Sequence, residues 1–220
     1  MSRAHGCVAV FAKPPRPGEV KTRLVPDLGE SGAAALARAF FLDTWASVSA
    51  LNWADAILAT TDVEADEWQL SDETQVWAQG DGDLGQRMER VLSRALDHYP
   101  FAIAVGTDAP GLPAALLGAA RHALASTDAV LGPSDDGGFY LIGLRRCPAD
   151  LLAGLPWSVD QTFERTITRL RAYGLRTAVL PRWFDVDRPS DLDRLRSMLA
   201  AGRVEAPETA RVLAARGAAR

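Results

Sequence analysis

Short apolar runs alternate with longer amphipathic stretches along most of the chain. The runs have the length of buried strands and cover residues 7–11, 56–61, 74–79, 101–105, 129–131, 139–144 and 177–180. Between them, apolar residues recur at helical spacing over residues 29–51, 84–99, 113–125, 158–174 and 189–201. Largely apolar strands that alternate with helices predict a mostly parallel sheet covered by helices on both faces.

The order of these elements also predicts how the chain is divided. We expect a three-layer α/β/α fold in one domain over residues 1–201, followed by a peripheral helical tail over residues 202–220. Ser158 is followed three residues later by Gln161, which is the spacing of a capping box. The sequence therefore predicts that one of the later helices begins at Ser158.

Composition narrows the classes of protein that the chain can represent. The 220 residues carry a formal net charge of −4, whereas nucleic-acid-binding proteins normally have a basic surplus, so we expect no nucleic-acid partner. No apolar run approaches the roughly 18–20 residues of a membrane span, and we expect no signal peptide. The only cysteines, Cys7 and Cys147, are expected to stay reduced. These features favour a cytoplasmic globular protein.

The loop after the first apolar run concentrates positive charge. The chain has 24 lysine and arginine residues but only two lysines, and both of them, Lys13 and Lys21, lie in this loop. Arg16 and Arg23 add two more cations, three prolines stiffen the loop, and Gly18 permits a sharp turn. A lysine is a compact point charge that can approach an oxyanion closely, so the pattern favours a phosphate-binding loop. The alternative is a solvated basic turn.

Carboxylates follow later strands of the predicted sheet. Asp108 comes soon after the run at residues 101–105, and ligands of open α/β sheets bind at the carboxyl ends of the strands. Asp185 and Asp187 precede a predicted helix, where one of them could complete a metal site with Asp108. Hard carboxylate oxygens suit Mg²⁺ bridged to phosphate oxygens. The alternative is that these acids cap the helices that follow them.

Two further loops are predicted at the same edge of the sheet. Asp135, Asp136, Gly137 and Gly138 form either a tight turn or an acceptor-binding loop, in which either acid could be a general base for a hydroxyl acceptor. Residues 82–87 precede a helix N-terminus and are either a loop that contacts a phosphate or a base, or a plain connection.

Six segments, in this order, resemble those of one known family. They are residues 11–24 (FAKPPRPGEVKTRL), 82–88 (GDLGQRM), 106–112 (GTDAPGL), 131–144 (LGPSDDGGFYLIGL), 155–158 (LPWS) and 184–192 (FDVDRPSDL). The chain resembles the bacterial GT-A-superfamily proteins known as radical-SAM/selenodomain-associated transferases, or arsenosugar-biosynthesis-type glycosyltransferases, over most of its length. It is more distantly similar to molybdenum-cofactor guanylyltransferases and phospholactate guanylyltransferases.

The resemblance implies a GT-A, Rossmann-like fold, a nucleotide diphosphate moiety and a bound Mg²⁺ or Mn²⁺. Together with the loops above, it indicates Lys13, Lys21, Arg23 and Asp136 as catalytic residues, and Asp108, Asp185 and Asp187 as metal ligands. The expected nucleotide-binding residues are Ala12, Lys13, Gly18, Lys21, Arg23, Gly82, Asp83, Gly85, Arg87 and Thr107. The expected acceptor-binding residues are Asp135, Asp136, Gly137, Gly138 and Trp157, although Trp157 could also be an ordinary half-buried residue.

The function we expect is metal-dependent transfer from a nucleotide-diphospho substrate to a small-molecule acceptor. Glycosyl transfer from a nucleotide sugar ranks first. The alternative, favoured by the lysines of the first loop, is nucleotidyl transfer, in which an NTP condenses with a phosphorylated small molecule and releases pyrophosphate. The first loop has prolines where nucleotidyltransferases have glycines, and Asp108 lacks the Asp-x-Asp partner common in glycosyltransferases. A second alternative is an inactive nucleotide-sensing module.

Overall fold

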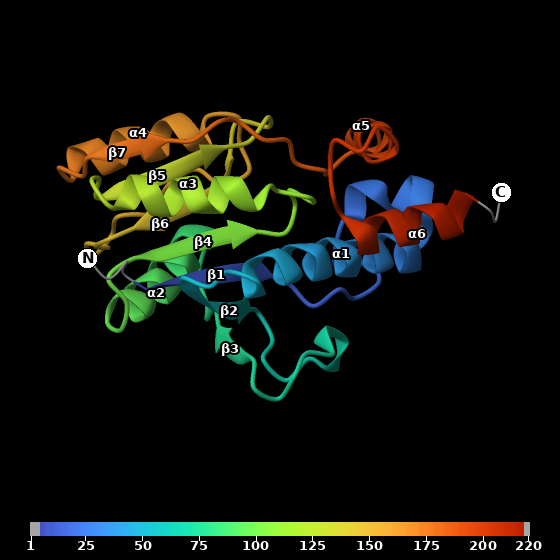
Figure 1. Cartoon of the computed structure of the whole chain (residues 1–220), viewed down its shortest axis with the longest axis horizontal. Helices are drawn as coiled ribbons and strands as arrows, with labels where there is room; N and C mark the ends of the chain where they lie inside the picture. The colour runs from blue at the N-terminus through green and yellow to red at the C-terminus, as the bar shows by residue number, and fades with distance from the viewer. Residues whose placement is uncertain (1–4, 218–220) are drawn as a thin grey trace.

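A seven-stranded sheet forms the centre of the computed structural model, which describes residues 5–217 (Figure 1). Its strands are β1 (Gly6–Ala12), β2 (Ala54–Thr60), β3 (Gln75–Ala78), β4 (Ala102–Gly106), β5 (Ala129–Pro133), β6 (Phe139–Leu144) and β7 (Thr177–Val179). Their order across the sheet is β3-β2-β1-β4-β6-β5-β7. Neighbouring strands are parallel except at β6, which is antiparallel to β4 and β5. The predicted mostly parallel sheet is confirmed.

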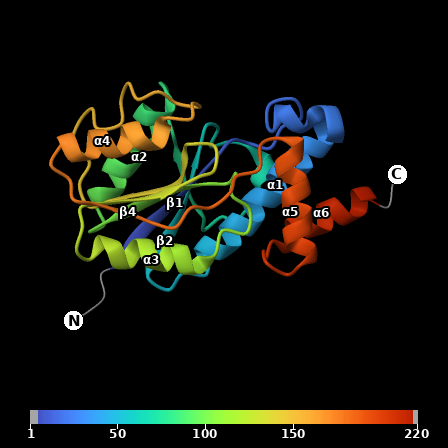
Figure 2. The same ribbon diagram turned by 90° about the horizontal axis from the view of Figure 1, so that it is seen from above.

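Helices cover both faces of the sheet, as the pattern predicts (Figure 2). The α-helices are α1 (Val25–Ser49), α2 (Leu84–Leu96), α3 (Ala114–Leu124), α4 (Thr162–Ala172), α5 (Pro189–Ala200) and α6 (Pro207–Gly217), and the 3₁₀ helices are η1 (Thr22–Leu24) and η2 (Asp66–Trp68). Ala9 of β1 belongs to the core cluster that includes α2 and α4. Its neighbours Val8 and Val10 belong to the cluster on the opposite face, with α1 and α3. This alternation is what a pleated strand buried on both faces produces.

One predicted helix start is wrong. The helix expected to begin at Ser158 begins at Thr162, because Ser158 has φ +60° and such left-handed backbone cannot belong to a right-handed helix. Instead of a capping box, the hydroxyl of Thr162 donates hydrogen bonds to the carbonyl oxygens of Pro156 (2.9 Å) and Val159 (2.8 Å). Residues 156–161 thus form an irregular loop ahead of α4.

A third hydrophobic cluster lies beyond the carboxyl edge of the sheet, where α5, α6 and the start of α1 meet (Figures 1 and 2). Leu24 of η1, Phe40 of α1, Leu195 of α5 and Val186 are fully buried in it. We call these packed elements, η1, the start of α1, α5 and α6 with residues 184–188, the end lobe. Every strand except β6 ends at the edge that faces the end lobe, and the segments after β1 and β7 lead directly into the lobe.

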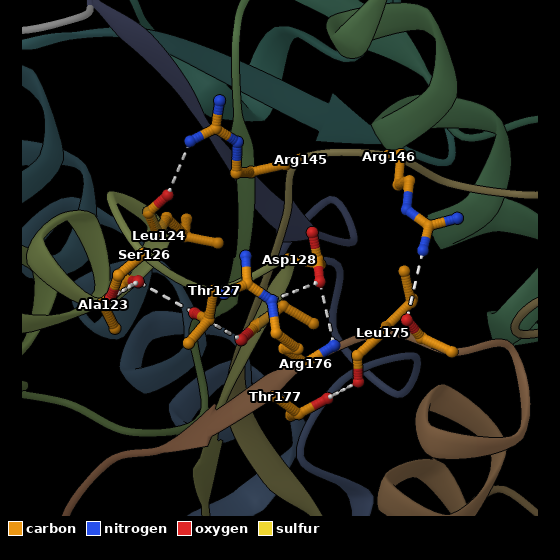
Figure 3. Close-up of polar contacts among 12 residues, drawn as sticks. Ala123, Leu124, Ser126, Thr127, Asp128, Arg145, Arg146, Leu175, Arg176 and Thr177 are labelled. Atoms are coloured by element: carbon orange, nitrogen blue, oxygen red, sulfur yellow. Dashed lines mark hydrogen bonds and ion pairs between the residues drawn. The ribbon is translucent and has the colours of Figure 1, made fainter.

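Polar contacts at the opposite, amino edge of the sheet hold β5 and β7 together (Figure 3). The Asp128 carboxylate accepts hydrogen bonds from the backbone N–H (2.9 Å) and the Nε (3.3 Å) of Arg176. These bonds, the backbone one first, lower the pKa of Asp128 below its ordinary value. Thr127 and Arg145 add hydrogen bonds to the carbonyl oxygens of Ala123 and Leu124 at the end of α3. These contacts fix the amino ends of β5 and β7 and the end of α3 to one another.

Both cysteines are free, in agreement with the expectation that they stay reduced. Burial raises the pKa of the Cys7 thiol to about 12 and that of the Cys147 thiol to about 11. Within residues 5–217, no helix combines the length and the apolar composition needed to cross a membrane.

Candidate active site at the carboxyl edge of the sheet

The loop that follows β1 is held rigidly at its first half. Pro14 and Pro15 are buried, while Lys13 between Ala12 and Pro14 is exposed. Arg16 donates hydrogen bonds to Glu67 (2.6 Å) and Asp62 (2.7 Å) in the segment after β2. Arg16 therefore anchors the loop, and Lys13 remains the accessible cation of its first half.

Lys21 occupies the centre of the site. Its backbone is left-handed (φ +47°), an uncommon conformation for a residue with a side chain, and its side chain is only 6% exposed. The Nζ atom donates a hydrogen bond to the carbonyl oxygen of Val186 (2.6 Å) and lies 2.7 Å from Oδ1 of Asp108 and 3.8 Å from Oδ1 of Asp187. The ring of Phe40 lies 5.5 Å away. One buried ammonium thus joins the loops after β1 and β4 to residues 184–188.

Asp108 does not cap the helix that follows it. Helix α3 starts after Pro113 and has no side-chain cap, so the alternative interpretation of Asp108 is excluded. The Asp108 side chain is 64% exposed, and its carbonyl oxygen accepts a hydrogen bond from the backbone N–H of Val186 (2.8 Å). The residue therefore faces solvent between the sheet edge and the end lobe, while its backbone is fixed to the lobe.

The capping alternative also fails for Asp185 and Asp187. The carboxylate that bonds the backbone at the start of α5 belongs to Asp191, which accepts from the N–H groups of Asp187 (3.1 Å) and Arg188 (2.8 Å). Asp187 instead pairs with Arg23 and, more distantly, with Lys21. Asp185 is half-buried, and its burial, reinforced by the nearby Asp136 carboxylate, raises its pKa to about 6.

The turn between β5 and β6 directs its two acids differently. Asp135 forms an ion pair with Arg194 of α5 (2.6 Å). Asp136 accepts hydrogen bonds from the Ser134 hydroxyl and from the backbone N–H of Gly138 (2.9 Å), so it lies inside the turn, near Asp185. Gly137 is required here, because its φ is +86° and a Cβ would lie 2.0 Å from the carbonyl oxygen of Asp160.

The predicted loop before α2 is largely used to start that helix. Asp83 is the N-cap, and it forms a capping box in which its carboxylate accepts from the backbone N–H of Gln86 (2.9 Å) while the Gln86 side chain accepts from the backbone N–H of Asp83 (2.9 Å). Arg87 donates a hydrogen bond from Nε to the carbonyl oxygen of Gly82 (2.9 Å). Gly85 is buried against Leu152 and Trp157.

Trp157 packs edge-on against Phe139, with ring centroids 6.0 Å apart, beside the start of α2. Its indole Nε1 is buried and has no hydrogen-bond partner among residues 5–217. Among the described residues the indole nitrogens of Trp68 and Trp183 are in the same state, so a buried donor without a partner is not particular to Trp157.

The three predicted metal ligands do not form one cluster. Asp108 and Asp187 lie 2.7 and 3.8 Å from the Lys21 ammonium, whereas Asp185 lies near Asp136. Within residues 5–217, no three histidine, cysteine or acidic side chains are grouped so as to hold a metal ion by themselves. Mg²⁺ is commonly held by one or two carboxylates together with substrate phosphates and water, so a pair of aspartates fits that mode of binding.

Several groups that shape the site carry no signal in the sequence. The carbonyl oxygen of Val186 and the ring of Phe40 reach Lys21 only because the end lobe packs against the loop after β1. Arg194 reaches Asp135 from α5, 59 residues further along the chain. The Asp83 capping box could have been recognised, because Asp83 and Gln86 have the required spacing. The predicted Gly18 and Thr107 are in the loops after β1 and β4, respectively.

Comparison with known proteins shows which family the chain resembles in sequence. The model of a family described as "Uncharacterized protein conserved in bacteria (DUF2064)" matches residues 44–159. The structure of a Desulfovibrio desulfuricans G20 protein, provisionally described as a nucleotide-diphospho-sugar transferase, is similar with a TM-score of 0.88 and 32% sequence identity. The alignment covers 98% of this chain and 96% of that one. No curated protein matches the sequence.

Two less similar solved structures share the fold. The 4-diphosphocytidyl-2C-methyl-D-erythritol synthase of Anaerococcus prevotii DSM 20548 has a TM-score of 0.58 and 12% identity, over 89% of this chain and 96% of its own. A CMP:2-keto-3-deoxy-manno-octonic acid synthetase in complex with CTP has a TM-score of 0.57 and 14% identity, over 90% of this chain and 100% of its own. At these identities the similarity is one of fold alone.

Proposed function

Since the chain belongs to the DUF2064 family of uncharacterized bacterial proteins, we propose that it is a transferase that uses a nucleotide-diphospho substrate and a divalent cation. The observation that carries the proposal is the meeting of Lys21, Asp108 and Asp187 at the carboxyl edge of the sheet. Ligands of open α/β sheets bind at this edge, and cations beside carboxylates there suit a metal-bound diphosphate.

We assign a different role in such a reaction to each group of residues in the site. Lys13 and Arg23 are exposed and would neutralise the charge that develops on the departing diphosphate, together with Lys21. Asp108, with Asp187 or Asp185, would hold Mg²⁺ or Mn²⁺, which supplies Lewis-acid stabilisation of the phosphate oxygens when bound. Asp136 would take the proton of a hydroxyl acceptor, for which the β5–β6 turn and Trp157 are the expected binding residues.

Glycosyl transfer from a nucleotide sugar to a small-molecule acceptor is the reaction we put first. It is supported by the 32% identity, over nearly the whole chain, to a protein provisionally described as a nucleotide-diphospho-sugar transferase. The radical-SAM and arsenosugar associations stay predictions. Nucleotidyl transfer from an NTP to a phosphorylated molecule is the second candidate, and the exposed Lys13 after β1 supports it, because a triphosphate and a phosphorylated acceptor bring more negative charge to this loop.

A screen of ligands followed by product analysis tests the proposal. Thermal unfolding is measured with NTPs and with UDP- and GDP-sugars, each with Mg²⁺ or Mn²⁺, because a ligand that binds the folded state raises the unfolding temperature. With the stabilising compound and candidate acceptors, release of a nucleoside diphosphate indicates glycosyl transfer and release of pyrophosphate indicates nucleotidyl transfer. Binding that persists in EDTA, without turnover, would indicate a nucleotide sensor. If no nucleotide of either kind stabilises the protein, the proposal fails.

A further inference from the structure

The two lysines of the loop after β1 are in opposite states. Lys13 is exposed and has no hydrogen bond or ion pair among the described residues, whereas Lys21 is 6% exposed and contacts three oxygen atoms. Two of those oxygens belong to carboxylates, Asp108 and Asp187, and the third is the carbonyl oxygen of Val186. A set of carboxylate and carbonyl oxygens is also the kind of ligand set that hard divalent cations prefer.

We infer that the Lys21 ammonium is a resident counter-ion between Asp108 and Asp187, which leaves these carboxylates and turns to the substrate's phosphates when a divalent cation binds. The inference rests on the proposed function, since it requires that a cation and phosphates enter this site. It assigns different roles to the two lysines: Lys13 meets phosphate directly, and Lys21 becomes available only after the carboxylates are neutralised by another cation.

Charge balance supports this role. Asp108 and Asp187 both approach one ammonium, at 2.7 and 3.8 Å from Nζ, so without a cation at this position the two negative charges would repel each other. Lys21 relieves that repulsion between Asp108 and Asp187, and Arg23 pairs with the other oxygen of Asp187. A divalent cation would be repelled by an ammonium that stays within about 4 Å. The divalent cation and the Lys21 ammonium therefore cannot both bind Asp108 and Asp187 without a large cost in electrostatic free energy.

The backbone conformation of Lys21 indicates that surrounding contacts hold this residue in place. Lys21 has φ +47°, a conformation that costs free energy in residues other than glycine and persists only where surrounding contacts enforce it. Lys21 contacts its surroundings through the Nζ bonds and the Phe40 ring, and its carbonyl oxygen accepts a hydrogen bond from the backbone N–H of Leu24 (2.8 Å) at the start of η1. Residues 17–19 ahead of it are exposed, and Asp108 is 64% exposed, so a cation and a phosphate can approach from solvent.

The small number of lysines makes a direct test possible. Protein labelled with ¹³C at lysine Cε gives one signal from Lys13 and one from Lys21, because the chain has no other lysine, and Lys13→Met assigns them. With Mg²⁺ present, alone or with the nucleotide that passes the thermal screen, the Lys21 signal should move toward that of an exposed lysine. The Lys13 signal should move only when the nucleotide is added.

Metal affinity gives a second readout that does not depend on turnover. Free Mn²⁺ is followed by electron paramagnetic resonance during titration of the wild type, Lys21→Met and the matched control Lys13→Met. Removal of the competing charge should raise the Mn²⁺ affinity of Lys21→Met by about tenfold or more, whereas Lys13→Met should bind Mn²⁺ like the wild type. If Lys21→Met does not fold, the response of the Lys21 signal in the wild-type protein still tests the inference.

The outcomes separate this inference from the proposed function. A Lys21 signal that stays unchanged with Mg²⁺ both with and without nucleotide, or an unchanged or lower Mn²⁺ affinity of a folded Lys21→Met, would overturn the inference. In that case a nucleotide-dependent shift of Lys13 would leave the proposed function standing. If neither lysine responds to any nucleotide with Mg²⁺, the proposed function fails as well.

Discussion

Asp43 of α1 holds the start of α6 through Thr209. The Asp43 carboxylate, 5% exposed, accepts hydrogen bonds from the backbone N–H (2.9 Å) and the hydroxyl (2.6 Å) of Thr209, and from the backbone N–H of Glu208 (3.0 Å). A carboxylate of one helix thus caps another that lies 166 residues away in the chain. Through α6, this contact completes the end lobe that presents Val186 and Asp187 to the site.

Replacement of Asp43 by alanine should therefore destabilise the protein strongly. The change leaves buried N–H and hydroxyl donors without an acceptor, and we expect a loss of roughly 2–4 kcal/mol in the free energy of unfolding. Urea unfolding followed by circular dichroism measures it. The control is Asp97→Ala at the exposed end of α2, which should change the stability by less than about 0.5 kcal/mol. Equal small effects of both variants would show that Asp43 does not hold α6 in solution.

Replacement of Asp108 by asparagine should remove activity without unfolding the protein. Asp108 is exposed and makes no helix cap, and Lys21 keeps Val186 and Asp187 as partners, so the loss of stability should be small. The proposed site, however, loses a cation ligand. We expect turnover to fall by about 10²- to 10³-fold, the range found when one preorganised charge-stabilising group is removed. Product release from the nucleotide identified in the screen measures it.

The matched control for Asp108 is an acid at the opposite edge of the sheet. Asp128→Asn also removes one carboxylate next to a strand, but far from the end lobe, and it should keep the turnover of the wild type (Figure 3). Equal loss of activity in both variants would mean that the effect of Asp108→Asn comes from general destabilisation, and full activity of Asp108→Asn would exclude Asp108 as a metal ligand.

Much of the fold and part of the site could be predicted from the sequence. The apolar runs locate the strands, and the rule that parallel strands end at one edge brings Lys21 and Asp108 together although 87 residues separate them. The antiparallel direction of β6 leaves no mark in its local pattern. The contacts of Val186 and Arg194 depend on how the end lobe packs, and hydrophobic periodicity does not determine such packing.

The sequence is misleading where tertiary contacts override a local pattern. Ser158 and Gln161 have capping-box spacing, but residues 156–161 pack against Gly137 and the start of α2, and the helix begins only at Thr162. Conversely, the sequence predicts that Asp83 binds nucleotide, while the structure places its carboxylate in a capping box. The start of α4 thus depends on neighbours that are distant in the chain, whereas the Asp83 capping box is a local contact that the spacing of Asp83 and Gln86 already indicates.

The contribution of Asp128 to the free energy of unfolding should depend on pH. Its pKa is lowered in the folded protein by the hydrogen bonds from Arg176, so the ionised carboxylate stabilises the fold above the unfolded-state pKa, and this contribution is lost as the pH falls through the folded-state value. We expect Asp128→Asn to be less stable than the wild type by about 1 kcal/mol at pH 7. The difference should shrink below about pH 4. Urea unfolding at several pH values measures it, and a difference that is constant from pH 7 to pH 3 would show that the charge is not involved.

Two glycine-to-alanine changes in helices should have opposite effects on stability. Gly85, in the first turn of α2, is buried, and a Cβ there would lie 2.1 Å from the carbonyl oxygen of Leu152 and 2.8 Å from the Trp157 ring. The α2 start or residues 152–157 must therefore shift, and Gly85→Ala should cost about 1–3 kcal/mol. Gly118 lies within α3, and a Cβ there would have no tertiary neighbour within 4 Å, so Gly118→Ala should stabilise the protein by about 0.5–1 kcal/mol.

The same pair of variants tests whether the start of α2 borders the nucleotide site. Because Gly85→Ala displaces the helix start that carries Asp83 and Arg87, it should weaken nucleotide stabilisation in the thermal screen by more than its loss of stability alone explains, whereas Gly118→Ala should leave it unchanged. Nucleotide affinities from titration calorimetry at a temperature where both variants are folded separate the two effects. Wild-type affinity of a destabilised Gly85→Ala would place the nucleotide elsewhere along the carboxyl edge, nearer to β1 and β4.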